Sequence, residues 1–170
     1  EKGVKKMKTE KIRLGVIGLG ARGFGLLRDN ITKLGEYFTV SGLCDVYEDR
    51  VEDARKLVTD SDSEASPLCT TKYEELLADK NTEAVLISCS WEYHVPIAVA
   101  AMKAGKAVLL EVGGAYSVDD CYELVRTWEE TKVPFMFMEN CCYDKLELLA
   151  TSMVKKGVFG EIVHCAGGYR

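Results

Sequence analysis

The sequence is poor in proline and histidine and has no excess of positive charge, and each shortage excludes a class of protein. Three prolines are too few for a proline-rich disordered chain. The formal net charge of -5 leaves no basic surface in bulk for a phosphate backbone, so we expect no nucleic-acid partner. No apolar run approaches the roughly 20 residues that span a bilayer. The N-terminus lacks the apolar segment of a signal peptide, so we expect a cytoplasmic protein without a membrane partner.

The spacing of metal ligands is also missing. The two histidines, His94 and His164, are far apart and no Cys-x-x-Cys pair occurs, so we predict no metal site. The seven cysteines fall mostly within apolar runs and their odd number leaves one unpaired, so we expect buried, reduced thiols. The vicinal Cys141 and Cys142 belong to no recognised redox motif and are interpreted as packing residues.

What the chain does have is a regular alternation of short apolar runs with amphipathic stretches. Hydrophobic residues make up 47% of the chain and charged residues 29%, as in a folded globular protein. The alternation predicts an α/β fold with a doubly wound parallel sheet, the Rossmann fold, completed by strand–helix alternations through Asn140. We expect strands at residues 12–18, 37–45, 84–89, 107–112 and 135–139, and helices at 21–34, 49–59, 71–78, 93–104 and 117–132.

Local signals fix some of these boundaries. Thr71 with Glu74, and Ser117 with Asp120, have the spacing of capping boxes. Residues 60–68, rich in serine and acidic side chains, are expected to form a surface loop. The apolar face of the helix at 117–132 is interpreted as core.

A glycine-rich turn follows the first expected strand. Gly18, Gly20 and Gly23 form the pattern G-x-G-x-x-G, with Ala21 and Arg22 between the last two glycines. Glycines let a backbone turn sharply and approach a pyrophosphate, which then faces the amides of the following helix. A tight turn without a ligand is the alternative. For Arg22, a contact with the pyrophosphate and a solvated position are both open.

A carboxylate in the right place strengthens the ligand-binding interpretation. Asp45 ends the second expected strand, 22 residues beyond Gly23. Such a carboxylate can accept both ribose hydroxyls of an adenosine and repels a 2'-phosphate, so NAD is the predicted cofactor rather than NADP.

Ligands of an open parallel sheet lie beyond the carboxyl ends of its strands, so the residues that follow each strand are further candidates. These are Ser88, Trp91 and His94 at and after the end of the strand expected at 84–89, Glu111 and Val112 at the end of the strand at 107–112, and Asn140 after the strand at 135–139. A ring such as that of Trp91 could stack on a planar cofactor or be a partly buried core aromatic. His94 opens a helix and is a candidate catalytic residue or a capping or packing residue.

These features together resemble the nucleotide-binding half of the Gfo/Idh/MocA oxidoreductases. The resemblance is carried by the glycine turn, by Leu86-Ile87-Ser88 followed by His94, and by residues 101–106 leading to Glu111. It implies a nicotinamide-binding domain followed by a larger, mostly antiparallel substrate domain, and hydride transfer between NAD and a sugar or polyol. The family usually has Glu-Lys-Pro where this chain has Glu111-Val112-Gly113, so its acid/base lysine is absent. We expect Lys106 on the wrong side of the strand to replace it.

A narrower resemblance is to NAD-dependent glycosidases of the α-N-acetylgalactosaminidase type, which also lack that lysine. In these enzymes a sugar hydroxyl is transiently oxidised, the neighbouring C–H becomes acidic, the glycosidic oxygen is eliminated and the hydride returns. This resemblance implies that Tyr169 faces the sugar as a candidate base, although it could equally be an ordinary strand tyrosine. The implied NAD contacts are Arg22, Gly23, Asp45, Trp91, His94, Glu111, Val112 and Asn140.

The expected organisation therefore has three parts. Residues 1–10 form a disordered tail, residues 11–140 the NAD-binding Rossmann domain, and residues 141–170 a linker helix (146–156) and the first strand (161–169) of a truncated α+β substrate domain. Alternatively, the last helix and strand fold back on the first sheet. The expected partners are a sugar or glycoside and, for the full-length protein, further copies of itself. A non-catalytic NAD-binding module is a third possibility.

Replacing Asp45 tests the cofactor assignment. A ligand that binds only the folded state raises the melting temperature by mass action. We expect NAD to raise the melting temperature of the protein, and Asp45→Ala to abolish most of that rise. A full NAD-dependent rise in the variant, measured by differential scanning fluorimetry, would refute the assignment.

Overall fold

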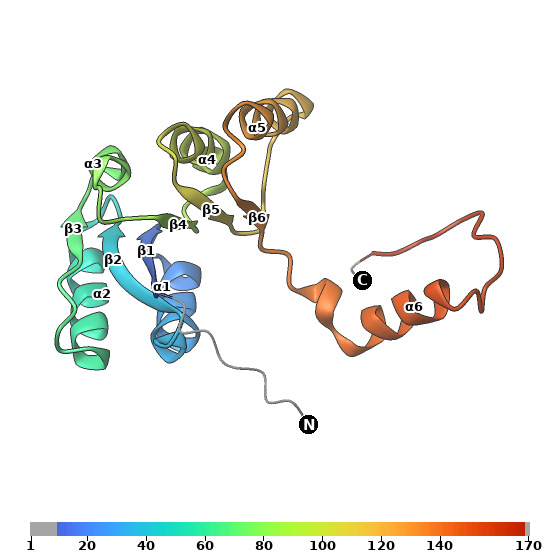
Figure 1. The fold of residues 1–170 in the computed structure, drawn as a ribbon, viewed down its shortest axis with the longest axis horizontal. Coiled ribbons are helices and arrows are strands. Elements are labelled where there is room, and N and C mark those ends of the chain that lie inside the picture. The colour runs from blue at the N-terminus through green and yellow to red at the C-terminus, as the bar shows by residue number, and fades with distance from the viewer. Residues whose placement is uncertain (1–9, 169–170) are drawn as a thin grey trace. The chain divides into compact units, whose positions relative to one another are not determined.

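A six-stranded sheet in which all neighbouring strands are parallel forms the centre of the first of two units in this computed structural model, which describes residues 10–168. The strand order is β3-β2-β1-β4-β5-β6 (Figure 1). This is the order of a doubly wound dinucleotide-binding sheet, so the predicted Rossmann fold is confirmed. The strands are Ile12–Ile17 (β1), Phe38–Cys44 (β2), Leu68–Thr70 (β3), Ala84–Ile87 (β4), Ala107–Leu110 (β5) and Phe135–Phe137 (β6).

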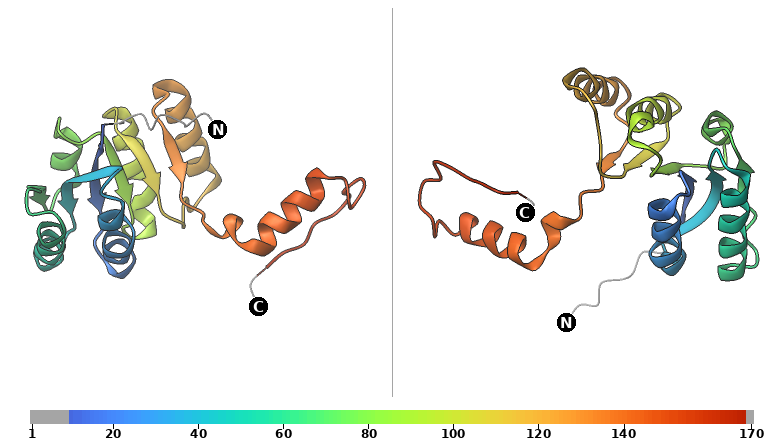
Figure 2. Two further views of the ribbon diagram at one scale, coloured as in Figure 1. Left: turned by 60° about the horizontal axis from the view of Figure 1, so that its bottom comes forward. Right: turned by 180° about the vertical axis from the view of Figure 1, so that it is seen from behind.

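Helices cover both faces of the sheet (Figures 1 and 2). One face carries Ala21–Asp29 (α1) and Glu48–Ser61 (α2), and the other carries Tyr73–Ala78 (α3), His94–Lys103 (α4) and Val118–Thr131 (α5). Successive side chains of a strand point to opposite faces. Val16 of β1 therefore packs in the cluster that includes α1 and α2, while Ile17 packs in the cluster that includes α3 and α4. Burial on both faces explains why the central strands are unbroken apolar runs in the sequence.

One predicted helix boundary was wrong, and one strand at the sheet edge was missed. The helix expected over 21–34 ends at Asp29, because Asn30 leaves helical geometry and Ile31–Leu34 form a separate 3-10 turn. Strand β3 was not predicted at all, since three residues at a sheet edge are too few to show a period.

The two capping predictions had opposite outcomes. The box at Ser117 and Asp120 is confirmed, with both reciprocal hydrogen bonds present. The box at Thr71 and Glu74 is wrong, because α3 begins two residues later and has no side-chain cap. The neighbouring Thr70 takes over part of this role: its hydroxyl donates to Glu75 and accepts from the Lys72 amide at 3.1 Å.

The second unit begins at Glu139, after the first ends at Met138. It contains a 3-10 turn at Cys141–Tyr143 and one helix, Lys145–Lys155 (α6). The strand expected over 161–169 is absent from the described residues 161–168, where the unit supplies no second strand for pairing. Tyr169 and the expected tail, apart from Glu10, lie outside the described residues. The assignment of 141–170 to a substrate domain remains a prediction.

The expectation of buried cysteines holds for few of them. None of the seven forms a disulfide, but only Cys44 is buried, and the vicinal Cys141 and Cys142 are exposed. The apolar face of α5, predicted as core, is also largely exposed at Val118 and Trp128. Within residues 10–168, no helix is long and apolar enough to cross a membrane, and no group of three potential metal ligands occurs.

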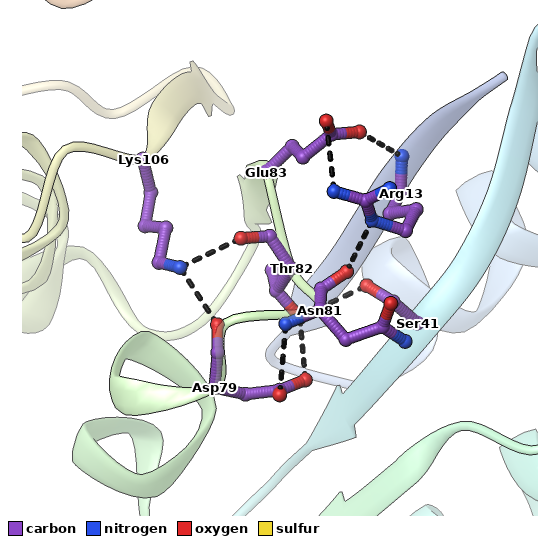
Figure 3. Close-up of polar contacts among 7 residues, drawn as sticks. All are labelled: Arg13, Ser41, Asp79, Asn81, Thr82, Glu83 and Lys106. Atoms are coloured by element: carbon purple, nitrogen blue, oxygen red, sulfur yellow. Dashed lines mark hydrogen bonds and ion pairs between the residues drawn. The ribbon is translucent and has the colours of Figure 1, made fainter. Parts of the chain in front are cut away.

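Polar contacts fasten the amino ends of β1 and β5 and the middle of β2 to the loop that precedes β4 (Figure 3). The Lys106 ammonium donates to the carbonyl oxygens of Asp79 and Thr82, both at 2.7 Å. The Thr82 hydroxyl donates to Asp79 and bonds the Ser41 hydroxyl of β2 at 2.9 Å. Arg13 of β1 pairs with Glu83 at 2.9 Å, and Lys106 directly precedes β5. Lys106 thus lies at the end of the sheet opposite the strand exits, as expected.

Removing the Lys106 ammonium should destabilise the fold. Lys106→Met leaves two loop carbonyls without their donor, which we expect to lower the free energy of unfolding by about 1–3 kcal/mol. Lys103→Met, at an exposed position of α4, is the control and should change this free energy far less. Urea denaturation followed by circular dichroism measures both. Equal effects of the two variants would contradict the structural role of the network.

Candidate functional site

The glycine turn between β1 and α1 is closed by backbone contacts that leave no room for side chains. Gly18 has a φ of +91°, and a Cβ there would overlap the backbone nitrogen of Cys89. A Cβ on Gly23 would overlap the carbonyl oxygen of Gly18. The first turn of α1 can therefore lie directly against the end of β1, which requires glycine at both positions.

The start of α1 is suited to an anion. Gly20 is the N-cap and provides no side-chain cap, and the first turn contains no acidic residue. The free amides and the positive end of the helix dipole therefore remain for a negatively charged ligand. Arg22 lies in the same turn and adds a full positive charge.

Asp45 fixes the turn to the end of β2. Its carboxylate accepts hydrogen bonds from the amides of Leu19 (2.6 Å) and Tyr47 (3.1 Å), and its side chain is only 6% exposed. The Arg50 guanidinium lies 3.6 Å from the same carboxylate and over the Tyr47 ring. The carboxylate is thus held beside the anion site, where an adenosine ribose would lie.

A cavity of about 620 Å³ opens at these strand ends. Six predicted site residues line it: Gly18, Gly20, Ala21, Arg22, Asp45 and Ser88. Sequence reasoning missed Arg50 and the aromatic wall of Tyr47, Tyr73 and Tyr93. Arg50 did carry a signal, because a cation in the first turn of a helix is disfavoured by the helix dipole and needs a compensating partner.

Two cavity-lining cysteines, Cys44 and Cys89, are apolar wall rather than nucleophiles. Burial raises the pKa of the Cys44 thiol to about 12, with nearby Asp45 contributing. Burial also raises the pKa of the Cys89 thiol to about 11. Both thiols are therefore protonated at neutral pH, and a protonated thiol is a poor nucleophile.

Glu111, directly after β5, is joined to the anion site by Arg22. Arg22 donates to Glu111 at 3.0 Å, and the Glu111 side chain is 9% exposed. Within the described residues, the second carboxylate oxygen of Glu111 and the hydroxyl of Ser88 are buried without a hydrogen-bond partner. Buried acceptors in this state are rare in proteins and indicate a missing donor such as a ligand hydroxyl or amide.

Val112 lies in the turn that follows β5, and Trp91 packs against the same turn. Trp91 is 55% exposed, so the interpretation as a core aromatic is wrong. Its indole lies over Gly113, where a Cβ would come within 2.5 Å of the ring. Val112, between this turn and Glu111, is partly exposed.

His94 is completely buried at the start of α4 and does not line the cavity. Its Nε2 lies 3.1 Å from the carbonyl oxygen of Cys89, so the tautomer with the proton on Nε2 is assigned. Burial lowers the pKa of His94, although the Cys89 carbonyl and the charge of Glu111 oppose this change. Its catalytic role remains a prediction, as do the roles of Asn140, in the second unit, and Tyr169.

The chain matches the family described as "Oxidoreductase family, NAD-binding Rossmann fold" (Gfo/Idh/MocA) over residues 12–139, which include the whole sheet and the cavity. It belongs to this family. The predicted cofactor, NAD, and the family resemblance are thereby confirmed.

The chain is also similar to curated proteins whose description is more specific than that of the family. The chain is 36% identical over 163 residues to a "Glycosyl hydrolase family 109 protein" of Solibacter usitatus, covering 93% of this chain and 37% of the relative. A second protein of that description from Phocaeicola vulgatus is 36% identical over 171 residues, covering 98% and 30% of the two chains. The chain spans about a third of the length of these relatives.

Solved structures share the fold. The WlbA dehydrogenase from Bordetella pertussis, in complex with NADH and UDP-GlcNAcA, has a TM-score of 0.79 at 21% identity, covering 89% of this chain and 45% of its own. The scyllo-inositol dehydrogenase from Lactobacillus casei, with bound NAD(H) and scyllo-inositol, has a TM-score of 0.77 at 18% identity, covering 89% and 43%.

Adding a methyl group at Gly23 should block the site. Gly23→Ala places a Cβ against the Gly18 carbonyl, so we expect unfolding to become easier by about 1–3 kcal/mol and NAD binding to be lost. Gly25→Ala is the matched control in the same helix, because no atom lies within 4 Å of its Cβ position. That control should keep NAD affinity and gain about 0.5–1 kcal/mol. Calorimetric titration with NAD and urea denaturation measure the two effects.

The buried His94 should make the fold acid-sensitive. Because its pKa in the folded protein lies below the 6.5 of a free histidine, the unfolded chain takes up a proton first as the pH falls. Its contribution to stability is therefore present above about pH 6.5 and is lost on acidification. His94→Gln should flatten the fall in melting temperature between about pH 7.5 and about pH 5.5. His164→Gln, at an exposed position, should leave the fall as in the wild type, and an identical slope in all three proteins would contradict the assignment.

Proposed function

We propose that this chain is the cofactor-binding part of an NAD-dependent enzyme that acts on a sugar or glycoside. The observation that carries the proposal is one cavity that combines a side-chain-free glycine turn, the fixed carboxylate of Asp45 and the unpartnered hydroxyl of Ser88. The unpartnered carboxylate oxygen of Glu111 lies behind the wall of this cavity, where Arg22 links Glu111 to it. The glycine turn and Asp45 suit the adenosine diphosphate half of NAD. The acceptors suit the hydroxyl and amide donors of the second half.

Within this proposal, redox-neutral glycoside cleavage is favoured over net oxidation. Val112 stands where the oxidoreductases of the family have their acid/base lysine, and Lys106 is committed to the opposite end of the sheet. The similar curated relatives are described as glycosyl hydrolases. When bound, NAD would supply the means to accept a hydride from a sugar carbon and return it.

The chain's own residues would bind and orient in this scheme. The amides of the first turn of α1 and Arg22 would hold the diphosphate, and Asp45 the adenosine ribose. Trp91 and Val112 would border the nicotinamide side, with Asn140 as a further contact. Tyr169 is the proposed base that removes the C–H proton made acidic by oxidation of the neighbouring carbon.

The proposal also covers the cellular compartment of the protein and its partners. A reducing compartment such as the cytoplasm is supported by seven cysteines that form no disulfide. The net charge of -5 supports a small-molecule substrate rather than a nucleic acid. Assembly of the full-length protein into a homo-oligomer is proposed from the family resemblance, and the lack of a membrane partner from the lack of a long apolar run in this sequence.

Incubating the full-length protein with NAD and panels of free sugars and aryl glycosides tests the function. We expect release of the aryl group without accumulation of NADH, because the hydride returns within each cycle. NADH absorbance that grows with a free sugar would instead support net oxidation. Binding of NAD without either signal across the panels would favour a non-catalytic module.

A further inference from the structure

Two arginines flank the glycine turn, and a buried carboxylate holds each of them. Arg50 lies 3.6 Å from Asp45, and Arg22 lies 3.0 Å from Glu111. The arginine side chains are 46% and 57% exposed and line the cavity, whereas the carboxylates are 6% and 9% exposed. Unlike Asp45, Glu111 does not line the cavity, so its link to the anion site runs through Arg22.

We propose that Glu111 is a positioning residue for the diphosphate site: it fixes the Arg22 guanidinium beside the first turn of α1, so that the ligand meets a cation already in place. The inference rests on the proposed binding of NAD. It adds that Arg22 contacts the diphosphate of the ligand, while Glu111 holds Arg22 in place.

The position of the pair in the fold supports this role. Arg22 belongs to the helix after β1, and Glu111 follows β5, with β4 between these strands in the sheet. The ion pair therefore bridges the end of β4 and joins segments 89 residues apart. Ser88 at that end lies next to the first turn of α1, since a Cβ on Gly23 would be 3.5 Å from the Ser88 Cβ.

The hydrogen bonds leave Arg22 able to bind an anion as well. Only Nη2 of its guanidinium is bonded to Glu111, and the side chain has no other hydrogen bond within residues 10–168. A guanidinium has five N–H donors, so several remain for phosphate oxygens. A free arginine loses side-chain entropy when it binds a ligand, and a tether established during folding reduces that loss.

Removing the tether and removing the cation should have different effects. Glu111→Gln keeps the shape of the side chain and removes the charge that holds Arg22. Arg22→Ala removes the cation itself and leaves the buried Glu111 charge without its partner, so its effect on stability should be larger.

A comparison of three ligands separates the contribution of the anion-binding groups to affinity from the contribution of the rest of the site. Titration calorimetry with adenosine, ADP and NAD would be run on the wild-type protein, Glu111→Gln, Arg22→Ala and the double variant. We expect Glu111→Gln to weaken ADP and NAD about three- to tenfold while adenosine affinity is unchanged. In the Arg22→Ala background, Glu111→Gln should weaken ADP no further. Glu83→Gln, which breaks the Arg13 pair at the amino end of the sheet, should leave all three affinities unchanged.

Two results would overturn the inference while NAD binding stands. An equal loss of adenosine and ADP affinity in Glu111→Gln would mean a general change of the site. The same loss of ADP affinity with and without Arg22 would mean that Glu111 acts independently of it. Failure of the wild-type protein to bind NAD or ADP would overturn the proposed function itself.

Discussion

The close approach of Gly23 to the carbonyl oxygen of Gly18 is the constraint on which the site depends. Because no side chain separates them, α1 begins directly against the end of β1, and its amides face the space beyond the strands. The Leu19 amide between the two glycines is free to bind Asp45, which connects the turn to β2. The first turn of α1 and the carboxylate of Asp45 are therefore positioned by one backbone contact and one hydrogen bond.

The polar groups at the two ends of the sheet differ in whether they have hydrogen-bond partners. At the amino ends, Lys106, Thr82 and the Arg13–Glu83 pair satisfy one another and the loop before β4. At the carboxyl ends, Ser88 and Glu111 keep buried acceptors without partners in the described chain. Complete satisfaction rigidifies the fold, whereas unsatisfied groups mark the place where a ligand completes the structure.

Sequence reasoning was most successful where chemistry is local or periodic. The glycine pattern, Asp45 and the apolar strands predicted the fold and six residues of the cavity wall, because each signal lies within one strand–turn–helix unit. The Arg22–Glu111 pair depends on a contact across the sheet and left no pattern in the sequence. The apolar face of α5 shows the opposite failure, since helical periodicity predicts an apolar face but not whether another element covers it.

In the turn after β5, this chain has Glu111-Val112-Gly113 where the family usually has Glu-Lys-Pro, and the difference involves more than the missing lysine. Gly113 has a φ of +114°, far from the roughly -65° that a proline ring imposes, and the Trp91 indole occupies the space of its missing side chain. Lysine and proline could not both be restored while the tryptophan keeps this position. Residues 91 and 113 are therefore coupled, because a side chain at position 113 can be introduced only if the aromatic ring at position 91 moves or is replaced.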